Sequence, residues 1–191
     1  MNSQGSPSTH PARRKAIGLA VLLALCAAGP AVGQASREYS VKAAFLYNFA
    51  TFVEWPAPLP PAGAPFVIGV LGDDPFGATL DEIVAGERVA GHPMVVRRFS
   101  RAEDVHSCQI LFISASESHR LPEILRRFEG QPVLTVSDLP GFAGAGGGIQ
   151  FITDTRVGII IDPAALRAAG LGVSSKLLRL ARVVREGAAP P

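Results

Sequence analysis

Short apolar runs recur along the chain after the first third, each followed by polar or turn-forming residues. Runs at 65–72, 94–99, 108–114 and 132–138 have the length and composition of strands that are buried on both faces of a sheet. Residues 148–162 hold two such runs around a short polar turn, which predicts an antiparallel hairpin. The pattern therefore predicts a sheet as the centre of the fold.

Apolar positions spaced three or four residues apart predict helices between these strands. The first expected helix, residues 37–55, ends before Pro56 and is rich in aromatic residues. Four more are expected: one that starts at Asp73-Asp74 with an aspartate cap and runs to 84, then 116–130, 163–170 with Asp162 as cap, and 173–186 with Ser174 as cap.

The order of these elements predicts the fold class. Strands that alternate with helices indicate a single three-layer α/β domain: a mostly parallel sheet with an antiparallel hairpin, and helices on both faces. The length of 191 residues suits one well-cored domain. We find no internal repeat.

The first 35 residues have the pattern of a secretory signal peptide. Arg13, Arg14 and Lys15 precede an apolar run at 16–28, and small residues lead to a predicted cleavage site after Ala35. The run is too short to cross a bilayer comfortably. We expect export to the periplasm, a mature domain at 36–186 and a disordered tail at 187–191.

Two other export signals fit this segment less well. Leu25 stands before Cys26, where a lipoprotein cleavage box needs a small residue. The pair Arg13-Arg14 is followed by residues that depart from a twin-arginine signal. Ordinary cleavage after Ala35 therefore stays the prediction.

Loss of the leader changes the charge and the cysteine content. The whole chain has 18 basic and 16 acidic side chains, and three of the basic ones lie in the leader, so the mature net charge is −1. This balance gives no indication of a nucleic-acid partner. Cys108 then stands alone, and the apolar residues after it favour a buried thiol over a redox or intermolecular handle.

Five glycines between Gly141 and Gly148 raise the question of a phosphate-binding loop. Such a loop opens into a helix, whose first N–H groups face the anion. Here the glycines lead into the apolar run that begins at Ile149, and Gly147 stands where the P-loop pattern needs lysine. We predict a flexible lead into the hairpin and no nucleotide cofactor.

Other catalytic patterns are missing as well. The three histidines after the leader lack the spacing of metal ligands. Ser114 or Ser116 beside His119 lacks a nucleophile elbow, which leaves a hydrolase as the weakest interpretation. We therefore expect no catalytic residue, metal or cofactor, and a binding or regulatory module instead of an enzyme.

A candidate ligand site lies where three of the predicted parallel strands end. Its residues are Asp73, Asp74, Ser114, Ser137 and Asp138. The carboxyl ends of strands are where α/β folds bind ligands, although capping explains the pair Asp73-Asp74 equally well. A small-molecule receptor is therefore the alternative function.

Two of the predicted helices are candidate partner-binding surfaces. The aromatic helix 37–55 would offer Tyr47 and Trp55, unless it is an ordinary core helix. The C-terminal helix would offer a basic stripe that includes Arg179 and Arg182, unless that stripe is a solvated face. Its opposite stripe, which we expect to be buried, consists of Val173, Leu177, Leu180 and Val184.

Five segments in the same order resemble the YfiR family of secreted bacterial proteins. They run from Val41 to Val184 and read VKAAFLYNFATFVEWP, GDDPFG, CQILFISASE, GQPVLTVSDLPGFAGAGGGIQF and AGLGVSSKLLRLARVV. The resemblance covers almost the whole mature chain. It implies a periplasmic α/β protein, often dimeric, without known catalysis.

The resemblance also implies a regulatory function. The namesake restrains an inner-membrane diguanylate cyclase by binding its periplasmic sensor part, and an outer-membrane lipoprotein relieves that restraint. We therefore expect a cyclase or a sensor kinase as partner, with a homodimer and an outer-membrane lipoprotein as further partners. Disulfides support the namesake's fold, whereas Cys108 alone permits no intramolecular bridge in the mature chain.

Overall fold

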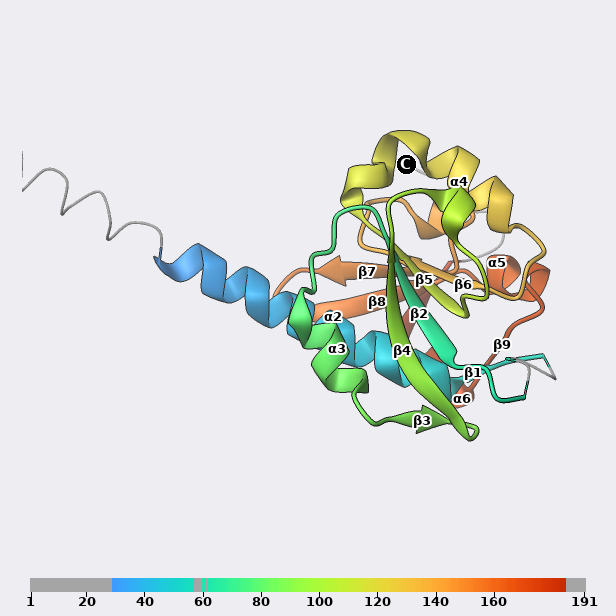
Figure 1. The fold of residues 1–191 in the computed structure, drawn as a ribbon. Coiled ribbons are helices and arrows are strands. Elements are labelled where there is room, and N and C mark those ends of the chain that lie inside the picture. Colours follow the sequence, from blue (N-terminus) through green and yellow to red (C-terminus); the bar gives the residue numbers. More distant parts are fainter. Residues whose placement is uncertain (1–28, 57–59, 61, 185–191) are drawn as a thin grey trace, which may run out of the picture. The chain divides into compact units, whose positions relative to one another are not determined.

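The computed structural model describes residues 29–56, 60 and 62–184 (Figure 1). The chain divides into two units, 1–37 and 38–191, and the fold described below is that of the second. The predicted tail and most of the predicted signal peptide lie outside the described residues. No helix in the described part of the chain is long and apolar enough to span a membrane.

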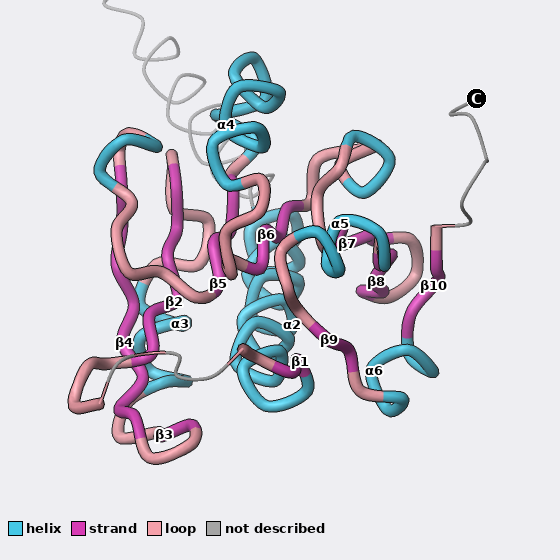
Figure 2. The backbone as a smooth tube through the Cα atoms, turned by 90° about the vertical axis from the view of Figure 1, so that its right-hand side faces the viewer, coloured by secondary structure: helices cyan, strands magenta, loops and turns pink. Residues whose placement is uncertain are grey.

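One eight-stranded sheet forms the centre of the domain. Its order is β10-β8-β7-β6-β5-β2-β4-β3, which Figure 2 shows with β4 towards the left and β10 at the right. Five neighbouring strands are parallel: β4 (His92–Phe99), β2 (Phe66–Leu71), β5 (Ile110–Ile113), β6 (Leu134–Ser137) and β7 (Ile149–Thr153).

Three further strands complete the sheet. β8 (Val157–Ile161) runs antiparallel to β7 and forms the predicted hairpin with it. β3 (Arg88–Val89) pairs antiparallel with the start of β4. β10 (Ala181–Val183) pairs parallel with β8 and is the last strand on its side. The predicted α/β class with a mostly parallel sheet is therefore confirmed.

Helices cover both faces of the sheet, and each face has its own apolar core. Side chains of α2 (Gly29–Phe52), α3 (Ala78–Val84), α5 (Pro163–Ala168) and α6 (Ser175–Leu180) belong to the core on one face. α4 (Leu121–Phe128) packs on the other. Every residue of β2 is buried, because this strand lies between both layers.

The predicted first helix is wrong at its end. α2 stops at Phe52, and β1 (Val53–Glu54) follows it and pairs antiparallel with β9 (Gly172–Val173). The indole of Trp55 folds back and donates from Nε1 to the carbonyl of Ala50 at 3.1 Å. A two-residue pairing with a distant segment therefore ends the helix before the proline does.

The predicted helix after β2 begins too early. α3 starts at Ala78, and its N-cap is Gly77 without a side-chain hydrogen bond. The carboxylate of Asp74 accepts from the N–H of Phe76 at 2.8 Å, which shapes a turn in place of a helix cap. The segment after β5 also differs, because the 3-10 helix η2 (Ala115–Arg120) precedes α4.

The largest difference lies at the C-terminal end of the domain. The predicted helix 173–186 is only six residues long, because α6 ends at Leu180 and β10 follows. Its predicted cap, Ser174, is confirmed by a hydrogen bond from the N–H of Leu177 at 3.4 Å. The predicted buried stripe is wrong at Leu180, which is 68% exposed, while Leu177 is buried.

Candidate functional site

The five predicted ligand-site residues lie at or directly after the carboxyl ends of β2, β5 and β6, as expected. The strand order reverses at β2, between β4 and β5, which is where folds of this kind bind ligands. Asp74 is already engaged there, because its Oδ2 accepts from Nε of Arg98 at 2.8 Å. Asp73 is exposed, and its N–H donates to Oγ of Ser116 at 3.0 Å.

The two serines of this set serve the backbone. Ser137 is fully buried, donates from Oγ to the carbonyl of Ile113 at 2.7 Å and accepts from the N–H of Leu139 at 3.1 Å. Ser114 is buried and caps η2 by accepting from the N–H of Ser116. Both hydroxyls therefore hold the ends of their strands in place.

Asp138 belongs to a group of charges that we call the Lys42 cluster: Glu38, Tyr39, Lys42, Asp138 and Thr153. Lys42 is 2% exposed, and its Nζ lies 2.7 Å from Oδ2 of Asp138 and 2.5 Å from Oε1 of Glu38. The Tyr39 hydroxyl donates to Asp138 at 2.9 Å, and the Thr153 hydroxyl donates to Glu38 at 2.8 Å. The cluster fastens α2 to the ends of β6 and β7.

The same contacts shift two pKa values within the cluster. The hydrogen bond from Lys42 lowers the pKa of Glu38 below its ordinary value, against the opposing effect of burial. Burial raises the pKa of Tyr39, and the nearby carboxylate of Asp138 raises it further. Lys42 was not among the predicted site residues, although a lysine in an apolar helix, four residues after Glu38, is a signal in the sequence.

Next to Asp73, the carboxylate of Glu117 has a buried oxygen without a hydrogen bond. Glu117 is 9% exposed, and its Oε2 has no hydrogen-bond partner among the described residues. The guanidinium of Arg120 lies 4.0 Å away, beyond hydrogen-bond distance. A Cβ on Gly72 would lie 2.3 Å from Oγ of Ser116, so η2 sits directly against the glycine that ends β2.

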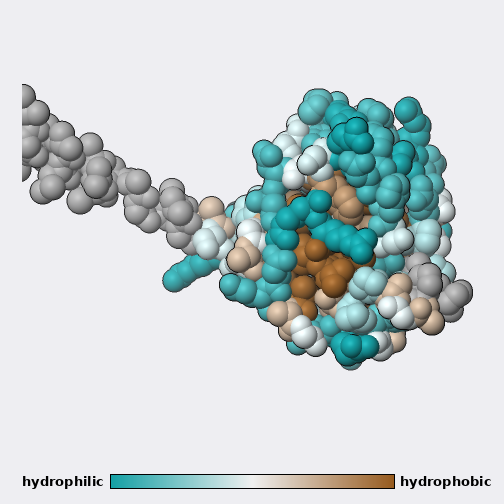
Figure 3. All heavy atoms as spheres, viewed as in Figure 1, coloured by the Kyte–Doolittle hydropathy of each residue, from teal (hydrophilic) through white to brown (hydrophobic). Residues whose placement is uncertain are grey.

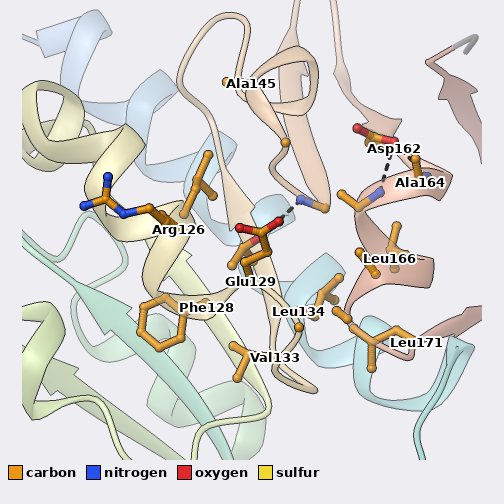
Figure 4. A pocket seen from close by; sticks show the side chains of 18 of the residues that line it. Arg126, Phe128, Glu129, Val133, Leu134, Ala145, Asp162, Ala164, Leu166 and Leu171 are labelled. Carbon is orange, nitrogen blue, oxygen red and sulfur yellow. Dashed lines mark hydrogen bonds between the residues drawn. The ribbon is translucent and has the colours of Figure 1, made fainter.

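A hollow of about 480 Å³ lies elsewhere, at the amino ends of β6 and β7 (Figure 4). Its walls come from α4, from the glycine segment (residues 141–148) and from α5. None of the five predicted ligand-site residues lines it. Its charged lining residues are the two acids Glu129 and Asp162 and the cation Arg126, whose side chain extends away from Glu129 in Figure 4. The confirmed cap at Asp162 also occupies the first N–H groups of α5. The hollow therefore favours a cation over a phosphate.

The glycine segment leads into β7, as the sequence predicts. Its glycines allow a tight wrap around Phe142, which is fully buried. A Cβ on Gly147 would lie 2.1 Å from Cε1 of that ring, and Gly146 has a φ of 95°, which a side chain rarely tolerates. The segment is therefore shaped by packing.

The two predicted partner-binding aromatics make contacts within the domain. The Tyr47 hydroxyl donates to Oε2 of Glu87 at 2.9 Å, and this bond raises its pKa. Trp55 is half-buried, and its ring packs edge-on against Phe66 with 5.2 Å between the ring centroids. Both side chains are thus partly used by the fold.

The C-terminal surface differs, because its side chains are exposed and its cations have no ion-pair partner among the described residues. We give this name to Lys176, Leu178, Arg179, Leu180, Arg182 and Val183. Leu180 is 68% exposed, Val183 46% and Leu178 37%. The three cations are exposed, and no described acid lies within ion-pair distance of them. Arg179 lies in α6, whereas Arg182 lies in β10 and not in the helix that we predicted.

Chemistry elsewhere in the described residues is limited. No group of three or more His, Cys, Asp or Glu side chains in that part of the chain is placed to hold a metal ion. Cys108 is buried as predicted, and burial raises the pKa of its thiol to about 12. Its Sγ lies 2.9 Å from the carbonyl of Ile110.

No curated protein shows a significant match to the sequence. The family described as YfiR/HmsC-like matches residues 39–182, which is most of the chain. This match is consistent with a regulatory role in cyclic di-GMP signalling in the periplasm, and the family is regulatory and not a known enzyme family. The chain belongs to the YfiR/HmsC-like family.

Proposed function

We propose that this protein binds and restrains the extracytoplasmic sensor part of an inner-membrane signalling protein. A diguanylate cyclase is the first candidate partner and a sensor kinase the second. Family membership supports a regulatory role. The observation that carries the proposal is the C-terminal surface, where exposed leucines lie beside cations without a described counter-charge.

Restraint of this kind is a shift between two states of the sensor. The protein restrains its partner when it binds the inactive arrangement more tightly than the active one. A shift from 1:99 to 99:1 needs a difference in affinity of about 10⁴-fold. A second binder, for which an outer-membrane lipoprotein is our candidate, would relieve the restraint by competing for the free protein.

A crosslinking pull-down from the native cell envelope tests the partner. The bait is the chain from Ser36 onward, and the matched baits are R179E/R182E on the C-terminal surface and R126E/R156E elsewhere. Both variants change the charge equally, and all four arginines are exposed. We expect a cyclase or kinase with the wild type and the control, and its loss with R179E/R182E.

The cellular consequence is measured separately. Deletion of the gene should raise cyclic di-GMP if the partner is a cyclase, and wild-type protein should restore the original level. Capture of no sensor protein by any bait, together with an unchanged level of the messenger, would overturn the proposed function.

A small-molecule receptor is the second candidate, and the hollow beside α5 is the observation that favours it. A volume of about 480 Å³ lies within the range of ligand pockets. Because Glu129 and Asp162 line it, we expect amines to raise the melting temperature and organic phosphates to leave it unchanged. The E129Q variant should weaken that response, and E82Q on the exposed side of α3 should not.

A further inference from the structure

The C-terminal surface contains an edge of the sheet that no described strand covers. β10 pairs with β8 on one side and with no other described strand. The N–H of Val184 donates to the carbonyl of Ile161 at 2.9 Å. Because alternate residues of a strand direct their backbone groups to opposite sides, Arg182 and Val184 face β8, and the N–H and C=O of Val183 face outward.

The side chains of β10 alternate in the same way. Ala181 packs against the core on the α2 face, so Val183 lies on that face and Arg182 on the opposite one. Leu178 and Leu180 lie just before the strand and add exposed apolar surface. An edge without a described neighbour, exposed aliphatic side chains and cations without a described ion pair therefore occur within a few residues of one another.

We propose that β10 accepts an extended segment of the partner as an added strand, and that this segment alternates apolar and acidic residues. The inference rests on the proposed function and specifies how its partner docks. A residue opposite Val183 would exchange two backbone hydrogen bonds with it, and an acid opposite Arg182 would form a cross-strand ion pair. An apolar side chain would lie beside Val183.

Charge and geometry disfavour two other occupants. A second copy of this chain would bring two sets of unpaired cations together. A membrane surface needs the apolar side chains on one face, whereas β10 places Arg182 and Val183 on opposite faces of the sheet.

The other edge of the sheet provides a comparison within the same molecule. β4 is paired by β3 only at its start, and Figure 3 shows apolar surface over β4 beside hydrophilic residues. There Arg98 is bound to Asp74 and Asp81, and the apolar residues Val95, Val96 and Phe99 are half-buried. The β10 edge therefore has the more exposed aliphatic side chains. Both edges carry an exposed arginine without an ion pair among the described residues, Arg97 in β4 and Arg182 in β10.

Two peptides and a vesicle test the proposal with the chain from Ser36 onward. The probes are an extended peptide of alternating valine and glutamate, the same peptide with lysine for glutamate, and vesicles with an anionic phosphatidylglycerol surface. We expect the glutamate peptide to bind and to slow hydrogen exchange of the Val183 amide at least tenfold, with no change at Val184. The lysine peptide and the vesicles should not bind.

Variants locate the bound strand. V183P removes the outward N–H of β10, V96P removes an outward N–H of β4, and R182E reverses the charge that faces the acid. V183P and R182E should each weaken binding of the glutamate peptide at least tenfold, and V96P should not. Melting temperatures show whether a proline variant still folds. If V183P does not fold, R182E gives an independent test of the same strand.

Three results would overturn the inference. The first is that the glutamate peptide does not bind. The second is that it slows hydrogen exchange at the amides of Val96 and Arg98 in place of Val183. The third is that the lysine peptide or the vesicles bind as tightly as the glutamate peptide. If the envelope pull-down still recovers a sensor protein in that case, the proposed function stands and docking uses another surface. If the peptide binds and no sensor is recovered, the strand site stands and the proposed partner is wrong.

Discussion

The Lys42 cluster and the C-terminal surface both carry lysine or arginine, but they use these charges in opposite ways. Lys42 is buried and holds two carboxylates within 2.7 Å, so its charge is fully engaged inside the domain. Arg179 and Arg182 are exposed and have no described ion pair. The first group connects elements of the fold, and the second remains available to another molecule.

The difference shows where candidate residues from the sequence can be misleading. Asp138 follows a strand as a ligand-binding acid would, yet Lys42 and Tyr39 already occupy its carboxylate. Its role as a ligand stays a prediction, and binding would have to compete with these contacts. The cations of the C-terminal surface face no such competition among the described residues.

Loss of Lys42 should have the largest effect on stability. K42M leaves Asp138 and Glu38 without their buried counter-charge, which should lower the free energy of unfolding by about 3 kcal/mol. The matched change K176M, on the C-terminal surface, should stay within about 0.5 kcal/mol of wild type. Urea titrations of the two variants provide the measurement, and equal losses would contradict the comparison.

Substitution of Ser137 should cause a smaller loss of stability. S137A removes the hydroxyl that serves the carbonyl of Ile113 and the N–H of Leu139, and it should cost about 1–3 kcal/mol. S175A changes an exposed serine at the start of α6 and is the control. A stability of S137A equal to that of wild type would show that another group replaces the hydroxyl.

The lowered pKa of Glu38 predicts a modest dependence on pH. A carboxyl whose pKa is lower in the folded state stabilises the fold above its ordinary pKa of 4.5, and that contribution disappears as the pH falls through the folded value. We expect less than about 1 kcal/mol from this surface-facing acid. Between pH 6 and pH 3, E38Q should lose less stability than wild type in thermal melts. An identical fall of the melting temperature with pH in both proteins would argue against a contribution of the Glu38 carboxylate.

Removal of the surface cations should have the smallest effect on folding. R179A/R182A should unfold within about 0.5 kcal/mol of wild type, because neither guanidinium pairs with a described residue. Its affinity for the captured sensor protein should fall, mainly through slower association that depends on salt. Surface plasmon resonance at two salt concentrations measures both rates. Unchanged rates would exclude these arginines from the interface.

Local patterns predicted much of the centre of the fold. β2, β5 and β6 are buried apolar runs, and they need no long-range information to be recognised. The caps at Asp162 and Ser174 also follow from local chemistry, and both are confirmed. Where a helix or strand depends on neighbours in sequence, the sequence was a sufficient guide.

The predicted structure is wrong where pairing with residues distant in the sequence decides the local conformation. Residues 181–183 have a helical spacing, yet they lie along β8, and Val53–Glu54 pair with Gly172–Val173. The contact between Lys42 and Asp138 spans 96 residues, so the pairing itself could not be predicted from local spacing. The exposed character of the C-terminal surface follows from the same misassigned strand.

The burial of Cys108 has a practical consequence. Its thiol is enclosed and has a raised pKa, so common thiol reagents should leave it unmodified near neutral pH. In a chain that starts at Ser36 it is the only cysteine. One substitution such as L180C would therefore create a single reactive attachment point, where a fluorophore or spin label could report contact at the open edge of the sheet.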